Sequence, residues 1–306
     1  MVQRSEGSFM PGPNNPSAPV EQFVSSDGVR INVATAPPNA TGGGVGSGRS
    51  VLLLHGFPDS WQLWHRQMKT LTDKGFRVIA PDLRGHGRSD RPTQVSAYRM
   101  GPLLADITAV LEHFGIRSTA VVGHDWGAAL AWNLAMRRPD VVDRLAVLSV
   151  GHPGAAMSAG IRQRQLSWYM LWFLHAGVAE SILPAQSWLA FRRWAWDGVA
   201  VGTDPQMDRQ IDDLSRPGAL EAALNLYRAN ITPESYFRTS VPPMPRVGCP
   251  VLGVWSAGDQ FLSEEQMTGS AAFVDGPWTY AKVQGAHWIP AQAPDELSAV
   301  LVDFLA

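Results

Sequence analysis

The sequence predicts an α/β protein with a mostly parallel sheet, helices on both faces of that sheet, and an inserted helical cap. Three observations predict this class. Short apolar runs without alternation recur along the chain and are typical of strands buried on both faces. Stretches with helical periodicity lie between these runs. One long segment, beginning near the middle of the chain, breaks the alternation and has a helical pattern.

Individual strands and helices can be assigned from these patterns. Residues 21–36 predict a hairpin, because a Ser-Ser-Asp-Gly turn separates two strand-like runs. Buried strands are expected at 51–54, 77–80, 120–122, 145–150 and 251–255. Helices are expected at 61–74, 100–114, 128–138 and 294–305.

The 306 residues divide into three expected parts. Residues 1–19 are rich in Pro, Gly, Ser and Asn and are expected to form a flexible tail. Residues 20–152 and 246–306 are expected to form the core, and residues 153–245 the cap, inserted after the sixth strand. Because pockets form readily between two such layers, we expect the substrate site there.

Composition and charge exclude several function classes. A net charge of -2 provides no basic field to attract nucleic acid. No apolar run reaches the roughly 18 residues that a membrane span needs, and the N-terminal segment lacks the apolar core of a secretory signal. The single cysteine excludes an internal disulfide. We therefore expect a cytoplasmic protein and leave monomer and homodimer open.

No cofactor or metal is expected from the sequence. The Gly-rich stretch 41–48 lacks the preceding strand and following helix of a phosphate-binding loop, and we expect it to be a surface loop. The histidines form no cluster with metal-ligand spacing. The chemistry is therefore expected to rest on groups of the protein itself.

The segment 121–128, VVGHDWGA, predicts a nucleophile at Asp125. A strand, a glycine-flanked turn and a helix follow one another here, with Asp in the nucleophile position of a G-x-Nu-x-G elbow. An Asp at this place can also serve as an ordinary N-cap. Backbone amides at a helix start favour a carboxylate anion and offset its desolvation, which suits a buried nucleophile.

A carboxylate nucleophile restricts the substrate. Attack on an ester would give a reactive anhydride, whereas attack on an electrophilic sp3 carbon gives a stable alkyl ester. The substrate is therefore expected to be an epoxide or a haloalkane. Hydrolysis of the ester at the Asp125 carbonyl carbon then needs an oxyanion hole and a base for water.

Candidates for the oxyanion hole and the base lie in two further segments. The backbone N–H groups of Phe57, in HGFP, and Trp126 are expected to form the two-donor hole. His287 follows the final strand and is the expected base, because an imidazole accepts a proton at neutral pH. Asp259 ends the preceding strand and is expected to orient His287 and stabilise its cation.

With these residues identified, the chain resembles the epoxide hydrolases of the α/β-hydrolase superfamily. The motifs that carry the resemblance are HGFPDSW, DLRGHGRSD, GHDWGA, SAGD and GAHWIP, and they span nearly everything after Val20. The resemblance implies an α/β-hydrolase fold and an Asp-His-Asp triad of Asp125, His287 and Asp259. It further implies that DLRGHGRSD is a structural loop, because relatives of many activities share it.

The same resemblance implies two cap tyrosines that donate hydrogen bonds to the epoxide oxygen. Such donors are needed because alkoxide is a poor leaving group, and a phenol stays protonated at neutral pH. Tyr227, in NLYRAN, matches the second tyrosine of the family, and Tyr169, in WYMLWF, the first. The residues after Tyr169 depart from the polar-then-proline pattern of the family. Trp61, Trp126 and Trp172 are expected to contact the substrate.

Two alternatives remain open. A haloalkane dehalogenase uses the same Asp nucleophile, but it needs two N–H donors for a halide. Trp126 would be one of them, and a cap tryptophan would have to supply the second. The fold also serves as a non-catalytic ligand-binding scaffold. Fluoroacetate dehalogenation fits less well, because Trp126 stands where that group has an Arg. An epoxide and water are thus the expected partners.

Overall fold

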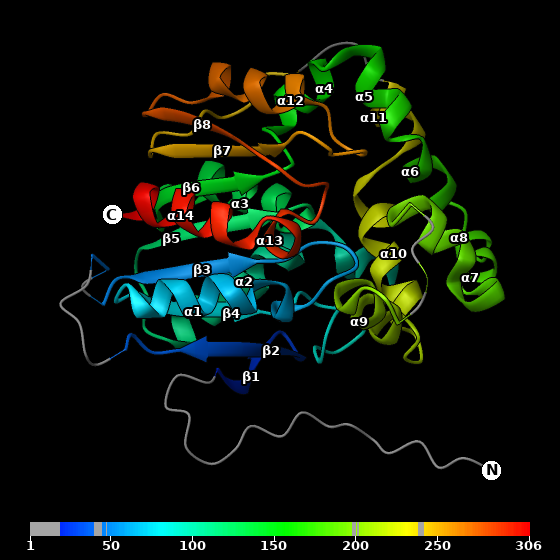
Figure 1. Cartoon of the computed structure of the whole chain (residues 1–306), viewed down its shortest axis with the longest axis horizontal. Coiled ribbons are helices and arrows are strands. Elements are labelled where there is room, and N and C mark those ends of the chain that lie inside the picture. The colour runs from blue at the N-terminus through cyan, green and yellow to red at the C-terminus, as the bar shows by residue number, and fades with distance from the viewer. Residues whose placement is uncertain (1–18, 40–44, 47, 198–199, 201, 238–241) are drawn as a thin grey trace.

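The computed structural model describes residues 19–39, 45–46, 48–197, 200, 202–237 and 242–306. The predicted tail, residues 1–18, and most of the predicted Gly-rich loop lie outside this part of the chain. Within it, eight strands form one sheet in the order β1-β2-β4-β3-β5-β6-β7-β8 (Figure 1). The strands are β1 (Val20–Ser26), β2 (Val29–Ala36), β3 (Ser50–Leu54), β4 (Arg77–Pro81), β5 (Thr119–His124), β6 (Val142–Leu148), β7 (Val251–Ser256) and β8 (Trp278–Val283).

The sheet is antiparallel only at one edge. β1 pairs with β2 and β2 with β4 in antiparallel register, and the remaining neighbours are parallel. Central strands are buried over their whole length, as in β5 and β7, because helices cover both faces. The predicted fold class, the hairpin and the five predicted buried strands are confirmed.

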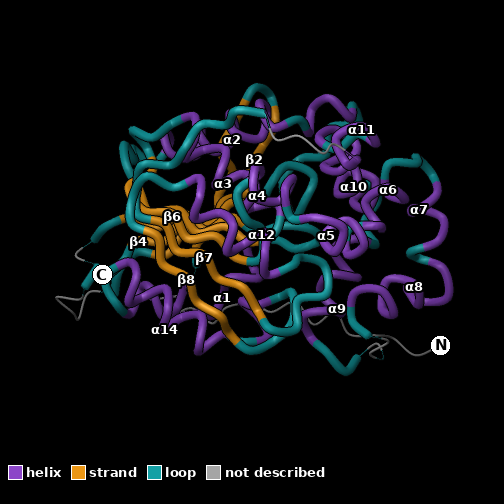
Figure 2. The backbone as a smooth tube through the Cα atoms, turned by 90° about the horizontal axis from the view of Figure 1, so that it is seen from above, coloured by secondary structure: helices purple, strands orange, loops and turns teal. Residues whose placement is uncertain are grey.

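Helices of the core lie on the two faces of the sheet. Figure 2 shows α1 and α14 on one side of the strands and α2 and α3 on the other. The helices of the core are η1 (Trp61–Trp64), α1 (His65–Asp73), η2 (Val95–Tyr98), α2 (Met100–His113), α3 (Trp126–Arg137), α12 (Glu264–Thr268), η3 (Gly269–Phe273), α13 (Ile289–Gln292) and α14 (Pro294–Leu305).

A second group of helices follows β6 and precedes β7. These helices stand together beside one end of the sheet in Figure 1. They are α4 (Pro153–Ser158), α5 (Gly160–Leu166), α6 (Trp168–Phe173), α7 (Val178–Ile182), α8 (Ala185–Ala195), α9 (Pro205–Leu214), α10 (Ala219–Asn230) and α11 (Pro233–Phe237). We refer to α4–α11 as the cap; the exact boundaries of the two parts, 153 and 245, stay predictions.

Local chemistry explains where some elements begin and end. α9 begins at Pro205 because the Asp204 side chain accepts hydrogen bonds from the Gln206 and Met207 amides. β6 ends at Leu148, earlier than predicted, because Ser149 takes a left-handed φ of 67°.

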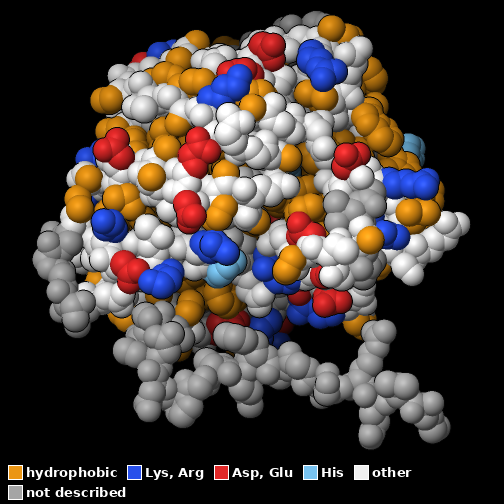
Figure 3. All heavy atoms as spheres, viewed as in Figure 1, with side chains coloured by type: hydrophobic (Ala, Val, Ile, Leu, Met, Phe, Trp, Pro, Cys, Tyr) orange, Lys and Arg blue, Asp and Glu red, His pale blue; other side chains and the backbone are white. Residues whose placement is uncertain are grey.

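The described surface is mixed in character. On the face shown in Figure 3, positive and negative side chains are interspersed, and apolar side chains gather along the cap edge. No helix in the described residues is long and apolar enough to cross a membrane.

Candidate active site

Asp125 lies at the sharp turn between β5 and α3. Its backbone has a φ of 52°, a left-handed conformation that is rare for a residue with a side chain and is typical of functional turns. A Cβ on Gly127 would lie 2.1 Å from the Leu54 carbonyl oxygen, so only glycine lets α3 approach β3 this closely. The turn thereby presents the Asp125 carboxylate at the carboxyl end of the sheet.

The two oxygens of the Asp125 carboxylate have different surroundings. Oδ1 accepts a hydrogen bond of 2.7 Å from the Phe57 backbone N–H. Oδ2 lies 3.7 Å from Nε2 of His287, the separation of an ion pair rather than of a direct hydrogen bond. Burial alone would raise the pKa of Asp125, but His287, His124 and the Trp126 backbone N–H hold it below its ordinary value. The Asp125 carboxyl group is therefore ionised.

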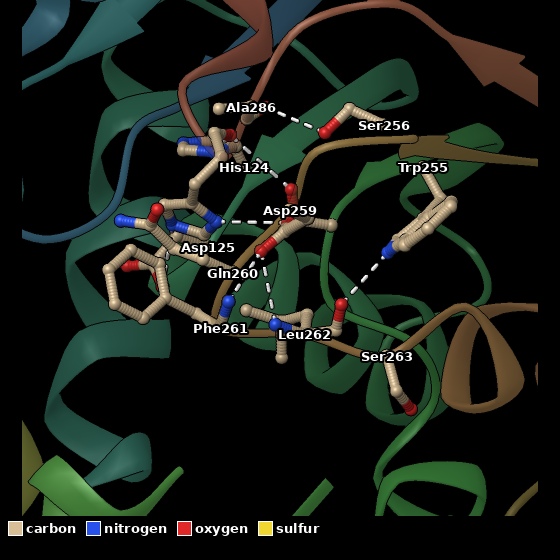
Figure 4. Close-up of polar contacts among 12 residues, drawn as sticks. His124, Asp125, Trp255, Ser256, Asp259, Gln260, Phe261, Leu262, Ser263 and Ala286 are labelled. Carbon is tan, nitrogen blue, oxygen red and sulfur yellow. Dashed lines mark hydrogen bonds and ion pairs between the residues drawn. The ribbon is translucent and has the colours of Figure 1, made fainter. Parts of the chain in front are cut away.

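Asp259 orients the imidazole from the other side. Its Oδ2 lies 3.1 Å from Nδ1 of His287, and its Oδ1 accepts the backbone N–H groups of Phe261 and Leu262 at 2.9 and 3.0 Å (Figure 4). Burial alone would raise the pKa of Asp259, but His287 and the two backbone donors outweigh that effect and hold the pKa below its ordinary value. Nδ1 of His287 thus donates to Asp259, and Nε2 faces Asp125.

His287 is buried between two carboxylates. Burial alone would lower its pKa, yet Asp259 and Asp125 together raise it to about 10. The resting imidazole is therefore a cation at neutral pH. It can act as a base only when one of the neighbouring negative charges is removed.

Both predicted tyrosines lie next to this triad. Tyr227, on α10, packs edge-on against Phe57 and Trp126, with ring centroids 5.5 and 5.1 Å away. Tyr169, on α6, lies next to Tyr227, with ring centroids 6.2 Å apart and the planes at 74°. Burial and the Asp125 charge raise both pKa values well above 10, so both phenols stay protonated.

A cavity of about 350 Å³ opens from Asp125 and Trp126 toward the cap. Most of its wall is apolar, and several of its polar side chains are already bonded within the protein, such as Gln163 and Asn230. The remaining lining residues are Ala129, Val150, Pro153, Ala156, Met157, Arg164, Ser167, Met170, Ile231, Ser235, Tyr236 and Leu262. The cavity thus suits a substrate with an apolar substituent.

Not every predicted contact residue lines this cavity. Trp126 does, but in the described structure Trp61, Trp172 and the two tyrosines are not among its lining residues. The Trp61 backbone N–H donates to Asp82 at 2.8 Å, and the Trp172 ring packs against Phe173. Sequence reasoning missed most of the wall, because cap positions such as Met157 and Met170 carry no motif.

One further polar residue supports the site. Nε2 of His124 lies 2.9 Å from the backbone carbonyl of His287, and the two rings are 4.8 Å apart. Burial lowers the pKa of His124 to about 4, so its ring is neutral and Nε2–H donates to that carbonyl. Its position beside Asp125 in the motif was the only sequence signal for this role.

The loops that resemble family motifs behave as structural elements. Nε2 of His55 accepts the Leu83 backbone N–H at 2.9 Å and so supports the loop that begins at Asp82. Asp82, at the start of DLRGHGRSD, accepts hydrogen bonds from the Trp61 and Arg88 amides, both at 2.8 Å. These contacts join neighbouring loops at the rim of the sheet.

Comparison with known proteins defines the class. The chain matches the alpha/beta hydrolase fold family over residues 49–294 and therefore belongs to it. It is 30% identical to Epoxide hydrolase A of Mycobacterium tuberculosis, with 94% of this chain and 98% of that one covered. It is also 30% identical to the AB hydrolase superfamily protein YfhM of Bacillus subtilis, with 93% and 97% covered.

Solved structures give the same result. A Bacillus megaterium epoxide hydrolase bound to an inhibitor has a TM-score of 0.80 at 27% identity, covering 93% of this chain and 99% of that chain. Epoxide Hydrolase A from Mycobacterium thermoresistibile has a TM-score of 0.77 at 28% identity, with 94% and 98% covered. The predicted resemblance to epoxide hydrolases and the prediction of a hydrolase enzyme are confirmed.

Proposed function

We propose that this protein hydrolyses epoxides to vicinal diols through an alkyl ester on Asp125. One observation carries the proposal: an ionised carboxylate has one oxygen on a backbone amide and the other facing His287, beside two protonated tyrosines. The names of the relatives agree with this reaction. All the groups that the chemistry needs come together, which argues against a non-catalytic scaffold.

In the first step, Oδ2 of Asp125 attacks a ring carbon of the epoxide. The carbon–oxygen bond opens, and the oxygen takes a proton from Tyr169 or Tyr227. Oδ1 is already held by the Phe57 amide, so Oδ2 is the free nucleophile. The product is an alkyl ester with a neighbouring hydroxyl.

In the second step, water attacks the carbonyl carbon of the ester. Esterification removes the charge of Asp125 and with it part of what keeps His287 protonated, so the imidazolium passes a proton to the tyrosinate left by the first step and becomes a base. Oδ1 becomes the oxyanion, held by the amides of Phe57 and Trp126. The intermediate collapses, and the diol leaves with Oδ2 and the proton that His287 took from water. The remaining proton of the attacking water passes from the new carboxyl group to His287 and restores the resting ion pair.

The surroundings of Trp126 favour an epoxide over a haloalkane. A dehalogenase would use the Trp126 indole N–H to hold the halide, but here the indole packs edge-on against the Tyr227 ring, with ring centroids 5.1 Å apart. Two phenols beside the nucleophile instead suit a leaving group that needs a proton.

The test compares two substrate classes on one protein. We expect wild type to convert styrene oxide to its diol and to release no halide from a primary bromoalkane. Asp125→Ala should lose diol formation while keeping its melting temperature within a few degrees. Halide release without diol formation would show that the protein is a dehalogenase instead. Diol formation by Asp125→Ala would show that Asp125 is not the nucleophile.

A further inference from the structure

A buried hydrogen-bond network joins the cap to the core next to the proposed active site. Asp59, in the loop after β3, is 2% exposed and accepts hydrogen bonds from two glutamines of cap helix α9. The Gln206 amide donates to Oδ1 and the Gln210 amide to Oδ2, the latter at 2.9 Å. Oε1 of Gln210 in turn accepts the indole N–H of Trp196 at 2.9 Å. We call Asp59, Gln210, Trp196 and Trp288 the Asp59 network.

The network ends on the loop of the catalytic base. Trp196, just after α8, stacks face to face on Trp288, with centroids 4.5 Å apart and planes at 7°. Trp288 directly follows His287 and is 2% exposed. Its ring lies edge-on to the imidazole, with ring centroids 5.2 Å apart. A shift of Trp196 therefore acts on the residue that adjoins His287.

The other end of the network lies in the oxyanion loop. The Asp59 backbone N–H donates to the Gly56 carbonyl at 2.9 Å and closes a turn that contains Phe57. A Cβ on Gly56 would lie 2.3 Å from Oδ1 of Asp125, so this turn is packed directly on the nucleophile. Any force on the Asp59 side chain is thus transmitted over two residues to the Phe57 amide.

The residues of this network have chemistry suited to one fixed geometry. A glutamine amide offers a donor and an acceptor at once, so Gln210 can bind Asp59 and Trp196 in the same conformation. Arg209 approaches Asp59 to 3.6 Å and partly balances its charge. Buried polar groups with these partners are costly to separate, so the contacts specify one position of the cap.

We propose that the Asp59 network is a positioning device by which the cap holds the Phe57 amide and His287 in place for hydrolysis of the ester. Gln210 and Trp196 touch neither substrate nor reacting atoms, so they are positioning residues. The inference rests on the proposed function for its kinetic consequence. The physical coupling of the two loops through α9 does not depend on that function.

The decisive variant is Gln210→Met, which keeps the volume and removes both hydrogen bonds. With styrene oxide, we expect ester hydrolysis to slow by roughly 10- to 100-fold, because small misplacements of catalytic groups cost about that much. Alkylation should change less than about twofold, so the alkyl-enzyme accumulates and is seen by intact mass spectrometry. Trp196→Phe should act in the same direction, and the double variant should add little to Gln210→Met alone.

A control variant and a second measurement complete the test. Asp212→Asn, at an exposed position of the same helix, should leave both steps unchanged. Hydrogen–deuterium exchange of the folded variants should increase together at residues 56–61 and 285–290 in Gln210→Met, and not in Asp212→Asn. If Gln210→Met does not fold, Trp196→Phe is judged by the same readouts.

The outcomes separate the two proposals. A lower melting temperature without ester accumulation or paired exchange would mean that the network only stabilises the fold, and the positioning role would be wrong. Exchange that rises at one loop alone would also contradict it. If wild type forms neither ester nor diol, the proposed function fails, and paired exchange would then still support the coupling.

Discussion

At the scale of residues, the charges of Asp125 and His287 depend on each other. Two carboxylates raise the pKa of the imidazole to about 10, and the imidazole in turn lowers the pKa of both carboxyl groups. In the resting site this keeps Asp125, the proposed nucleophile, ionised and His287, the proposed base, protonated. Alkylation of Asp125 removes one negative charge, so the base becomes available only when an ester is present. Such an order would prevent water from being activated without a substrate.

Replacement of the two tyrosines tests which groups protonate the epoxide oxygen. We expect Tyr227→Phe and Tyr169→Phe each to slow alkylation roughly 10-fold or more, and the double variant to lose most of the 10²- to 10⁴-fold contribution typical of general acids. The measurement is the rate of ester formation in a single turnover. Tyr236→Phe is the matched control, because Tyr236 lines the cavity while its hydroxyl donates to the Arg164 carbonyl. An equal loss of alkylation rate in the three single variants would contradict the assignment of Tyr169 and Tyr227.

At the scale of elements, the site depends on how closely α3 approaches β3. Asp125 reaches its left-handed turn only because the flanking glycines leave no side chain between helix and strand. The same approach brings Gly56 and Phe57 against the carboxylate. The proposed nucleophile and oxyanion donor are therefore placed by one packing contact, between α3, which follows β5, and the end of the neighbouring parallel strand β3.

Gly127→Ala tests this contact. The added Cβ would meet backbone atoms at 2.1 Å, so a strand or a helix must move. We expect a loss of at least about 2 kcal/mol in the free energy of unfolding, measured by denaturant titration, together with loss of activity. Gly101→Ala in α2 is the control, since nothing lies within 4 Å of its Cβ, and it should gain up to about 1 kcal/mol. Similar stabilities for the two variants would contradict the packing argument.

At the scale of the whole molecule, local sequence signals predict the sheet better than the cavity. Strands β3 to β7 are mostly buried and apolar, so their runs are visible in the sequence. The bounds of β8 were not predicted, because this edge strand is mostly half-exposed and its pattern is weak. The triad positions followed from motifs that end strands. The cavity wall did not, since it depends on how short cap helices pack over the core.

Stability of the whole fold should depend on pH through His287. Its pKa of about 10 lies above the ordinary 6.5, so the folded protein holds a proton that the unfolded chain releases. This stabilisation is complete below about pH 6.5 and is lost as the pH rises toward 10. We expect the free energy of unfolding to fall by roughly 2–4 kcal/mol across that interval, measured by denaturant titration.

The variant His287→Gln provides the comparison for this pH dependence. It should show a flatter curve between pH 6.5 and 9.5, because it lacks the titrating imidazole. The buried carboxyl groups of Asp59 and Asp82 titrate near pH 6 and so contribute mainly below this window. Parallel curves for wild type and variant would show that His287 is not held as a cation.

The covalent ester on Asp125 is the central claim, and one isotope experiment tests it most directly. A single turnover of styrene oxide in ¹⁸O-water is followed by mass spectrometry of the peptide that contains Asp125. Because water attacks the carbonyl carbon and the diol leaves with Oδ2, we predict one ¹⁸O atom in the Asp125 carboxylate and none in the diol. A labelled diol with unlabelled Asp125 would mean that water attacks the epoxide directly, and the ester mechanism would be wrong.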